Sequence, residues 1–196
     1  MIPMICEIAG QLCIPAEWIL GIMEHEMAMM NVLDVIADRL VILYWRGWHL
    51  QNRLHVHHNP EWKRHGMIRN DSSTGYGQIF ARTAMEALNF ARRNQIYDPQ
   101  RTFSSDNPED MWYVWNRLRT DRRFNVLVCG LCLIHAGTGI NETRPTQAYT
   151  PDEVRKMFSR YNAKTATITE YGKEVYRISM NWKKYLLQNE LTHTES

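Results

Sequence analysis

A glutamate in the segment 15–33 stands where helical spacing predicts burial. Pro15 and Glu17 are typical of the first turn of a helix. Residues spaced three and four apart then share one face of that helix: Trp18, Ile22, Glu26, Met29, Met30 and Leu33. Glu24 falls on the other, solvated face. Burial disfavours an ionised carboxylate, so we expect a raised pKa for Glu26, as a general acid requires. The alternative is a glutamate at the edge of the apolar face that reaches water or pairs with an arginine.

A second segment, SSTGYGQI at 72–79, combines two glycines with an aromatic residue and an amide. Glycines bounded by small polar residues predict a tight turn or a hairpin. Gly75 and Gly77 would let the backbone approach a ligand closely, while Tyr76 and Gln78 offer a flat apolar face and hydrogen bonds. An ordinary glycine-containing turn is the other interpretation of this segment.

These two segments and two later ones together resemble a known family. The sequences IMEHE at 22–26, STGYGQI at 73–79, RYN at 160–162 and YG at 171–172 occur in the order found in the lysozyme superfamily. The chain is most similar to the branch of soluble lytic transglycosylases and goose-type lysozymes. The motifs span residues 14–175, and the segment between the first two has no counterpart that we can place.

The resemblance implies a lysozyme-like fold and a role for each matched residue. Glu26 corresponds to the catalytic acid, Gln78 to the glutamine of the cleft, and Tyr161 with Asn162 to the Tyr-Asn pair that closes it. Tyr76 would line a neighbouring subsite. Met27 stands where the family usually has serine.

Two reaction types follow from the number of carboxylates. The resemblance implies a peptidoglycan-cleaving glycosidase acting on the MurNAc-β-1,4-GlcNAc bond, and glycosidases usually need a second carboxylate beside the acid. Gly75 stands where hen-type lysozymes carry theirs, and Asp71 is the nearest candidate, although an aspartate there also suits a turn. With Asp71 in the cleft the enzyme would be a hydrolytic muramidase. With Glu26 alone it would be a lytic transglycosylase that forms a 1,6-anhydro product.

Composition and patterning predict one mainly α-helical domain. The chain has 196 residues with 44% hydrophobic content, enough for one sizeable core. Helix starts are indicated by Thr83 with Glu86, by 105–110 and by Thr150 with Glu153, and 124–136 reads as a buried helix. We therefore expect a single lysozyme-like domain over 1–196 with at most a small β-hairpin near Gly75. Residues 27–72 would form an insertion-like helix, bent or ended near Gly47, and a histidine-rich loop.

The remaining expectations concern ligands, partners and location. His49, His55, His57, His58 and His65 lack the spacing of a zinc site, so we expect neither a metal nor another cofactor. A net charge of +2 does not indicate nucleic-acid binding, and no segment predicts a membrane span. Cys129 and Cys132 lie in an apolar run and are expected to be buried thiols.

The first residues do not form the pattern of a signal peptide. We therefore expect delivery to the periplasm or cell wall by a secretion system or phage lysis machinery. The partners would be peptidoglycan glycan strands and a cognate immunity protein. A non-catalytic cell-wall-binding module and a helical interaction protein remain the alternatives from other functional classes.

Overall fold

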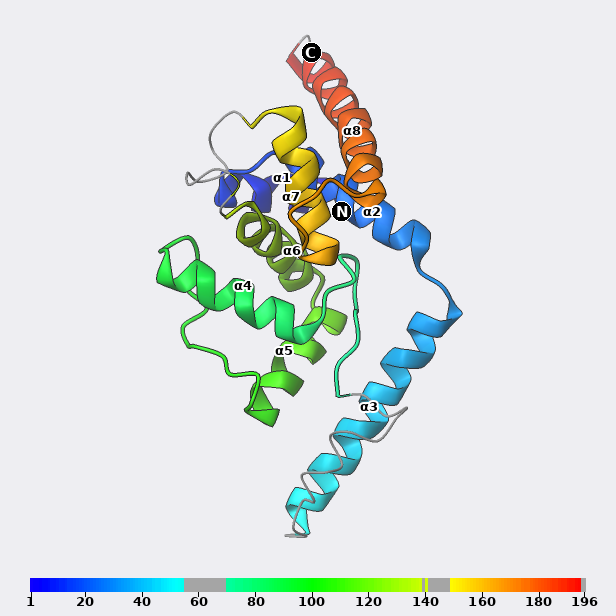
Figure 1. Ribbon diagram of the computed structural model, residues 1–196, viewed down its shortest axis with the longest axis vertical. Helices are drawn as coiled ribbons and strands as arrows, with labels where there is room; N and C mark the ends of the chain where they lie inside the picture. The colour runs from blue at the N-terminus through cyan, green and yellow to red at the C-terminus, as the bar shows by residue number, and fades with distance from the viewer. Residues whose placement is uncertain (55–69, 139, 141–148, 195–196) are drawn as a thin grey trace.

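Helices form the regular structure of the described residues, which confirms the predicted mainly α-helical class. The computed structural model describes residues 1–54, 70–138, 140 and 149–194. Within these ranges it has no β-strand, and Figure 1 shows how its helices are arranged. They are α1 (Ile2–Leu12), α2 (Ala16–Met29), α3 (Val32–Arg53), α4 (Ala81–Arg93), α5 (Pro108–Thr120), α6 (Arg122–Gly137), α7 (Pro151–Ala163) and α8 (Glu170–Thr194).

Side-chain caps begin several helices where the sequence predicts them. The Thr150 side chain accepts from the backbone N–H of Glu153, while the Glu153 carboxylate accepts from the backbone N–H of Thr150. This reciprocal pair satisfies two N–H groups that the first turn of α7 leaves without helical partners. At α5 the side chain of Asn107 accepts from the N–H of Glu109.

The start of α4 differs from the prediction. Thr83 was expected to cap this helix, but α4 already begins at Ala81, and Phe80 at its cap position offers no side-chain acceptor. The Asp71 carboxylate takes that role from ten residues upstream. It accepts from the N–H of Ala81 at 2.9 Å and from the N–H of Arg82 at 3.2 Å. The cap is therefore a tertiary contact, which a local sequence pattern cannot reveal.

The core is built around α6, which is buried over most of its length. Its exposed fraction is 0% at Val126, Val128 and Cys129, as expected for the apolar run 124–136. Helices α1, α4, α5 and α7 pack against α6, and α8 packs along both α2 and α7. At Gly21 a Cβ atom would lie 3.0 Å from the Cβ of Ser179, so the absent side chain permits the close approach of α2 and α8.

The chain turns sharply between α2 and α3, where one continuous helix was expected. Met30 has extended backbone geometry, and Asn31 starts α3 with a capping box that includes Asp34. The apolar face predicted to run through to Leu33 therefore ends early. Met29 is 66% and Leu33 72% exposed. Helix α3 continues through Gly47, so the predicted break at that glycine is also wrong.

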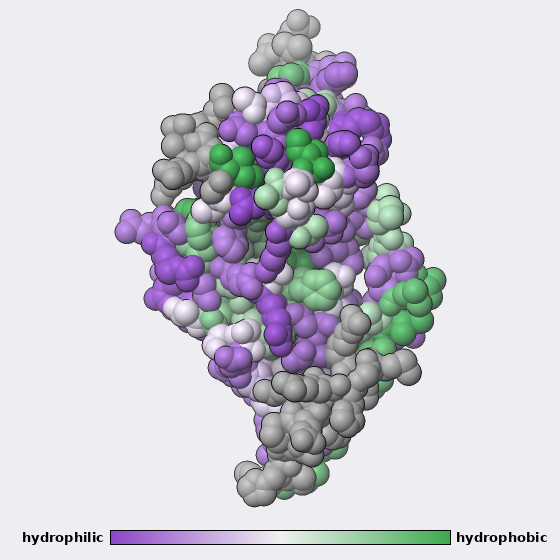
Figure 2. Space-filling model, viewed as in Figure 1, coloured by the Kyte–Doolittle hydropathy of each residue, from purple (hydrophilic) through white to green (hydrophobic). Residues whose placement is uncertain are grey.

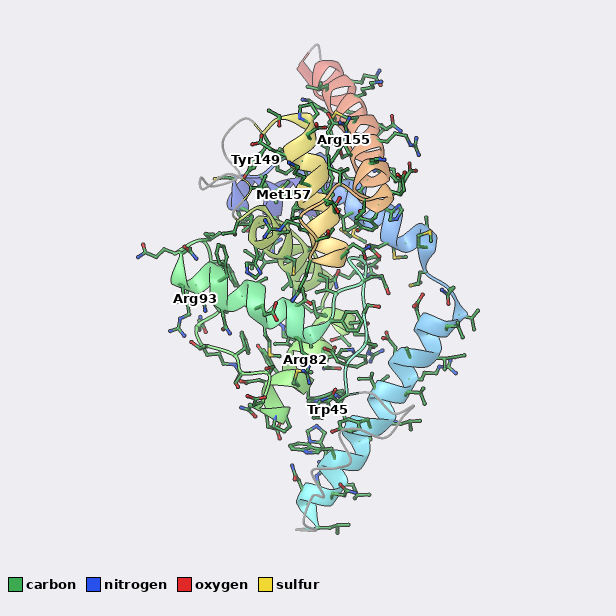
Figure 3. All side chains as sticks on the ribbon, in the orientation of Figure 1. Trp45, Arg82, Arg93, Tyr149, Arg155 and Met157 are labelled. Atoms are coloured by element: carbon green, nitrogen blue, oxygen red, sulfur yellow. The ribbon has the colours of Figure 1, made fainter. Side chains whose placement is uncertain are left out.

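Helix α3 extends away from the other helices and is fastened along one side (Figure 1). Trp45, labelled in Figure 3, is 1% exposed, and its indole N–H donates to the carbonyl of Asn70 at 3.1 Å. Its ring lies 6.0 Å from that of Trp112 in α5. The Asp38 carboxylate accepts from the hydroxyls of Ser72 and Thr74 at 2.8 and 2.7 Å. These contacts fix α3 against the segment that follows residue 69.

A cavity that joins Glu26 to the glycine-containing turn

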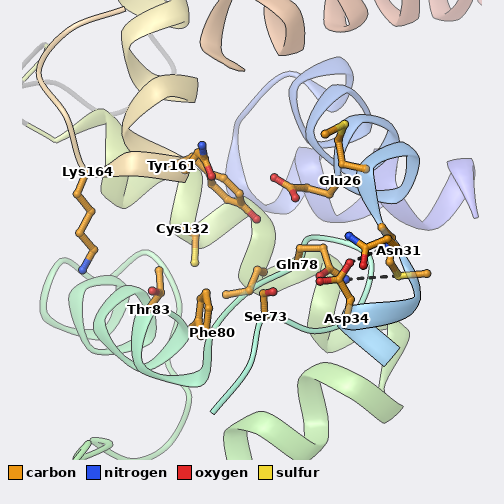
Figure 4. Close-up of a pocket in the computed structure, with 14 residues that line it drawn as sticks. Glu26, Asn31, Asp34, Ser73, Gln78, Phe80, Thr83, Cys132, Tyr161 and Lys164 are labelled. Carbon is orange, nitrogen blue, oxygen red and sulfur yellow. Dashed lines mark hydrogen bonds between the residues drawn. The ribbon is translucent and has the colours of Figure 1, made fainter. Parts of the chain in front are cut away.

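A cavity of about 290 Å³ opens where α2, α4 and α7 approach the turn at 74–79. Figure 4 shows this cavity with its lining side chains. Four of the residues singled out from the sequence line it together, although they come from distant parts of the chain: Glu26, Gln78, Tyr161 and Asn162. Its other lining residues are Met29, Met30, Asn31, Asp34, Ser73, Ile79, Phe80, Thr83, Cys132 and Lys164.

Glu26 is the carboxylate that the last turn of α2 directs into the cavity. In Figure 4 its side chain points toward Tyr161 on the opposite wall. One of its oxygens, Oε1, accepts a 2.5 Å hydrogen bond from the Tyr171 hydroxyl. Burial raises the pKa of Glu26 and the nearby charge of Asp34 adds to this, while the Tyr171 hydrogen bond opposes both. The raised pKa favours the protonated acid that can donate a proton.

Glu24, two residues earlier, has a different environment. It is exposed, and its carboxylate accepts from the indole N–H of Trp182 at 2.7 Å. The structure thus places the two glutamates on different faces of α2, as the helical spacing predicts. Glu26 faces the cavity and Glu24 faces the outer surface beside α8.

Tyr171 is positioned by the first turn of α8. The Thr169 hydroxyl accepts from the N–H of Gly172, and the backbone N–H of Thr169 donates to the Ser159 hydroxyl of α7 at 2.9 Å. The Tyr171 ring also lies edge-on to His25, with 4.8 Å between ring centroids. Burial and the adjacent Glu26 carboxylate raise the pKa of Tyr171, which keeps its hydroxyl protonated as a donor.

The turn at 74–79 is a minimal hairpin whose shape depends on Gly75 and Asn125. Thr74 and Ile79 form an isolated antiparallel bridge. Gly75 has φ +71°, and a Cβ atom there would lie 2.1 Å from Nδ2 of Asn125. The fully buried Asn125 side chain donates to the carbonyl of Leu118 and accepts from the N–H of Gly77 at 3.0 Å. Glycine is therefore required at position 75.

Tyr76 and Gln78, the two hydrogen-bonding side chains of the predicted motif, lie in different surroundings in this hairpin. Gln78 has a positive φ of 44°, lines the cavity and donates to the Gly75 carbonyl at 2.9 Å. Tyr76 instead packs, half-buried, against the hydrophobic core and is not among the residues that line the cavity. The structure thus does not bring Tyr76 to this cavity with Gln78, and its role in a neighbouring subsite stays a prediction.

The end of α7 forms the wall opposite Glu26. The Tyr161 hydroxyl donates to the carbonyl of Gly77 at 2.8 Å, which ties this wall to the hairpin. Asn162 lies beside it on the cavity surface. Lys164 adds a positive charge at the rim, where it forms an ion pair with Glu86 at 2.8 Å.

Asp71, the candidate for a second carboxylate, is not among the residues that line the cavity. Both oxygens of Asp71 are engaged at the start of α4, and burial raises the pKa of Asp71 to about 6 against the opposing effect of these hydrogen bonds. Asp34 lines the cavity instead. Its Oδ2 accepts from the backbone N–H of Asn31 at 2.8 Å.

Sequence reasoning missed Asp34 because it assumed an unbroken helix through Met30. The pattern Asn31-x-x-Asp34 is a helix-start signal that would have placed a carboxylate beside the α2 terminus. The partnership of Tyr171 with Glu26 was also missed. It joins residues 145 positions apart, a separation that no local sequence pattern bridges.

Metal and thiol chemistry find no support in the described part of the chain. No group of three or more potential metal ligands comes together among those residues. His55, His57, His58 and His65 lie outside the described residues. Cys129 and Cys132 are buried free thiols, as predicted, and burial raises the pKa of Cys129 to about 12, far from a reactive thiolate.

Comparisons with known proteins leave the family open. No protein-family model matches the chain, and neither a curated protein nor a solved structure matches it. Among the helices that the structure describes, none combines the length and apolar character needed to cross a bilayer.

Proposed function

We propose that the chain is a peptidoglycan-cleaving glycosidase, with Glu26 as its catalytic acid and base. The observation that carries this proposal is the environment of Glu26. Its carboxyl group is held by Tyr171 on a cavity wall, and burial raises its pKa. A raised pKa favours the protonated carboxylic acid, and this form can donate a proton to the oxygen of a glycosidic bond. The resemblance of four motifs to lytic transglycosylases and goose-type lysozymes supplies the substrate class.

The walls of the cavity suit a sugar polymer. Gln78 and Asn162 present amides that can hydrogen-bond hydroxyl and N-acetyl groups, and Tyr161 and Phe80 add aromatic surface. The cavity is lined from several elements, so these groups would contact one bound sugar segment from different sides. The bond cleaved would be the MurNAc-β-1,4-GlcNAc bond.

A lytic transglycosylase mechanism uses only the groups already described. Glu26 donates its proton to the bridging oxygen, the C1–O bond breaks, and the muramic N-acetyl group stabilises the positive charge at C1. The Glu26 carboxylate then takes the proton of the muramic C6 hydroxyl, whose oxygen bonds to C1. The products are a 1,6-anhydro sugar and a new GlcNAc end, and Glu26 is protonated again.

Hydrolysis by a muramidase is the second candidate, and the position of Asp34 favours it. Asp34 lines the same cavity and its charge contributes to the raised pKa of Glu26. A second carboxylate across the cleft is what an inverting hydrolase needs to activate water. Asp34 replaces Asp71 in this proposal because Asp34 lines the cavity, whereas Asp71 lies outside it with both oxygens engaged at the start of α4.

Mass spectrometry of the soluble products from purified peptidoglycan tests both candidates. Anhydro-muropeptides released by the wild type and by Glu24→Gln, but not by Glu26→Gln, are expected for the transglycosylase. Glu24→Gln is a matched control because it makes the same chemical change two residues away on the outer face. Reducing-end products lost in Asp34→Asn would assign hydrolysis instead. Absence of products from the folded wild type would contradict catalysis and leave a binding or interaction protein.

A further inference from the structure

The outer face of α3 exposes two rows of side chains that each repeat every seven residues. The apolar row consists of Ile36, Leu43 and Leu50, which are 45%, 60% and 58% exposed. The basic row, three residues further along, consists of Arg39, Arg46 and Arg53, all exposed. The two rows lie side by side on one helical face, in the arrangement of the a and d positions of a coiled coil. We call this surface the α3 stripe.

The apolar surface continues beyond the stripe toward the cavity. Most large apolar side chains that are well exposed within the described ranges lie between residues 27 and 54. Val32 and Leu33 at the start of α3 are 73% and 72% exposed. Figure 2 shows part of this surface as the hydrophobic patch at the junction of α2 and α3. Contiguous apolar surface of this kind marks binding sites on proteins.

The charges on α3 are divided between its two faces. Asp38 points inward to Ser72 and Thr74, and the Asp34 carboxylate is engaged by the backbone at the helix start. No carboxylate of the described residues forms an ion pair with the arginines of the stripe. The outer face is thus both apolar and positively charged.

We propose that the α3 stripe binds an amphipathic helix of an acidic partner protein. Charge complementarity selects this occupant. Large aliphatic side chains of such a helix would pack between Ile36, Leu43 and Leu50, and its carboxylates would pair with the guanidinium groups of the basic row. A second copy of the stripe would bring further arginines and no carboxylate to this surface. An anionic membrane is the other surface that a basic row beside an apolar row could meet, and the flotation measurement described below separates the two.

Binding of synthetic three-heptad peptides to the full chain tests this proposal. In each peptide, leucine and glutamate alternate at intervals of three and four residues. Glutamate follows leucine by three residues in one peptide and by four in the other, so that parallel and antiparallel docking are each covered. Calorimetry should show micromolar binding of at least one phase that weakens at high salt. Peptides with lysine in place of glutamate should not bind. Failure of both glutamate peptides to bind the folded chain would overturn the proposal.

Charge reversal at the stripe identifies the site of binding. Arg39→Glu combined with Arg46→Glu should weaken binding of the glutamate peptide at least tenfold and permit binding of the lysine peptide. The matched control reverses two exposed arginines elsewhere, Arg93→Glu with Arg122→Glu, for the same change in net charge. Equal loss in both variants would show a non-specific charge effect and refute the assignment.

Two further measurements separate the other occupants. Self-association of the wild type that is lost in Leu43→Glu would assign the stripe to a second copy. Flotation with phosphatidylcholine vesicles containing phosphatidylglycerol, dependent on Arg39 and Arg46, together with no peptide binding, would assign it to an anionic membrane. Either result would overturn the proposal. The outcome does not depend on Glu26, so it is independent of the proposed glycosidase activity.

Discussion

Removing the Tyr171 hydroxyl should raise the pKa of Glu26 further above its ordinary value. This hydroxyl donates a 2.5 Å hydrogen bond to Oε1 of Glu26, and the bond is strongest when the carboxylate is ionised. Hydrogen bonds to charged groups contribute about 1.5–3 kcal/mol. Because Glu26 is only partly buried, we take the lower end, about 1.5 kcal/mol, as the stabilisation of the ionised form. In Tyr171→Phe the ionised form loses this stabilisation, so the pKa moves upward.

Carbon-detected NMR titration of the glutamate carboxyl groups measures this shift, with Glu26→Gln used to assign the resonance. In an active enzyme the alkaline limb of the kcat/KM profile should move upward by the same amount, because the acid stays protonated to higher pH. Tyr161→Phe is the matched control, since it removes a hydroxyl from the same cavity that donates to the Gly77 carbonyl instead. An unchanged or lowered Glu26 pKa in Tyr171→Phe would refute the account of Glu26 given above.

Three further predictions concern stability. The pKa of Glu26 is raised in the folded state, so the free energy of unfolding falls as pH rises through that pKa. Glu26→Gln should therefore raise the Tm at about pH 8 but change it little at about pH 4. Gly75→Ala should lower the free energy of unfolding by about 3 kcal/mol in chemical denaturation, because of the positive φ at this position and the clash with Asn125. Gly47→Ala, in open space within α3, should instead raise it by about 0.5–1 kcal/mol. Asp71→Ala should lower the free energy of unfolding by about 1–2 kcal/mol through loss of the α4 cap. Asp71→Asn should retain glycan cleavage. Loss of cleavage in a folded Asp71→Asn would make Asp71 a reacting group again.

The parts of the fold that local patterns determine were predictable from sequence. Thr150 with Glu153 and Asn107 with Pro108 define helix starts through groups only a few residues apart. The apolar run 124–136 could only be a buried helix in a chain without strand patterns. Helical periodicity also separated Glu26 from Glu24, because a difference of two positions changes the face by about 200°.

The features that the sequence patterns did not predict depend on contacts between distant segments. Asp71 caps α4 from outside the helix, so Thr83 was chosen from an adequate local motif that the structure does not use. The turn at Met30 was missed because its residues continue the helical periodicity, and only the Asn31 capping box signals the break. Asp34 and Tyr171 became candidates once the packing of α2 against α8 and the direction of α3 were known.

The two hydrogen bonds at Asp38 give α3 a mechanical connection to the cavity. One carboxylate on the helix holds the hydroxyls of Ser72 and Thr74, and Thr74 is paired with Ile79 across the hairpin that carries Gln78. Helix α3 is therefore attached to the hairpin segment at Asp38 and again, two turns further along, at Trp45. The position of α3 and that of the cavity wall carrying Gln78 are thus linked through a single carboxylate.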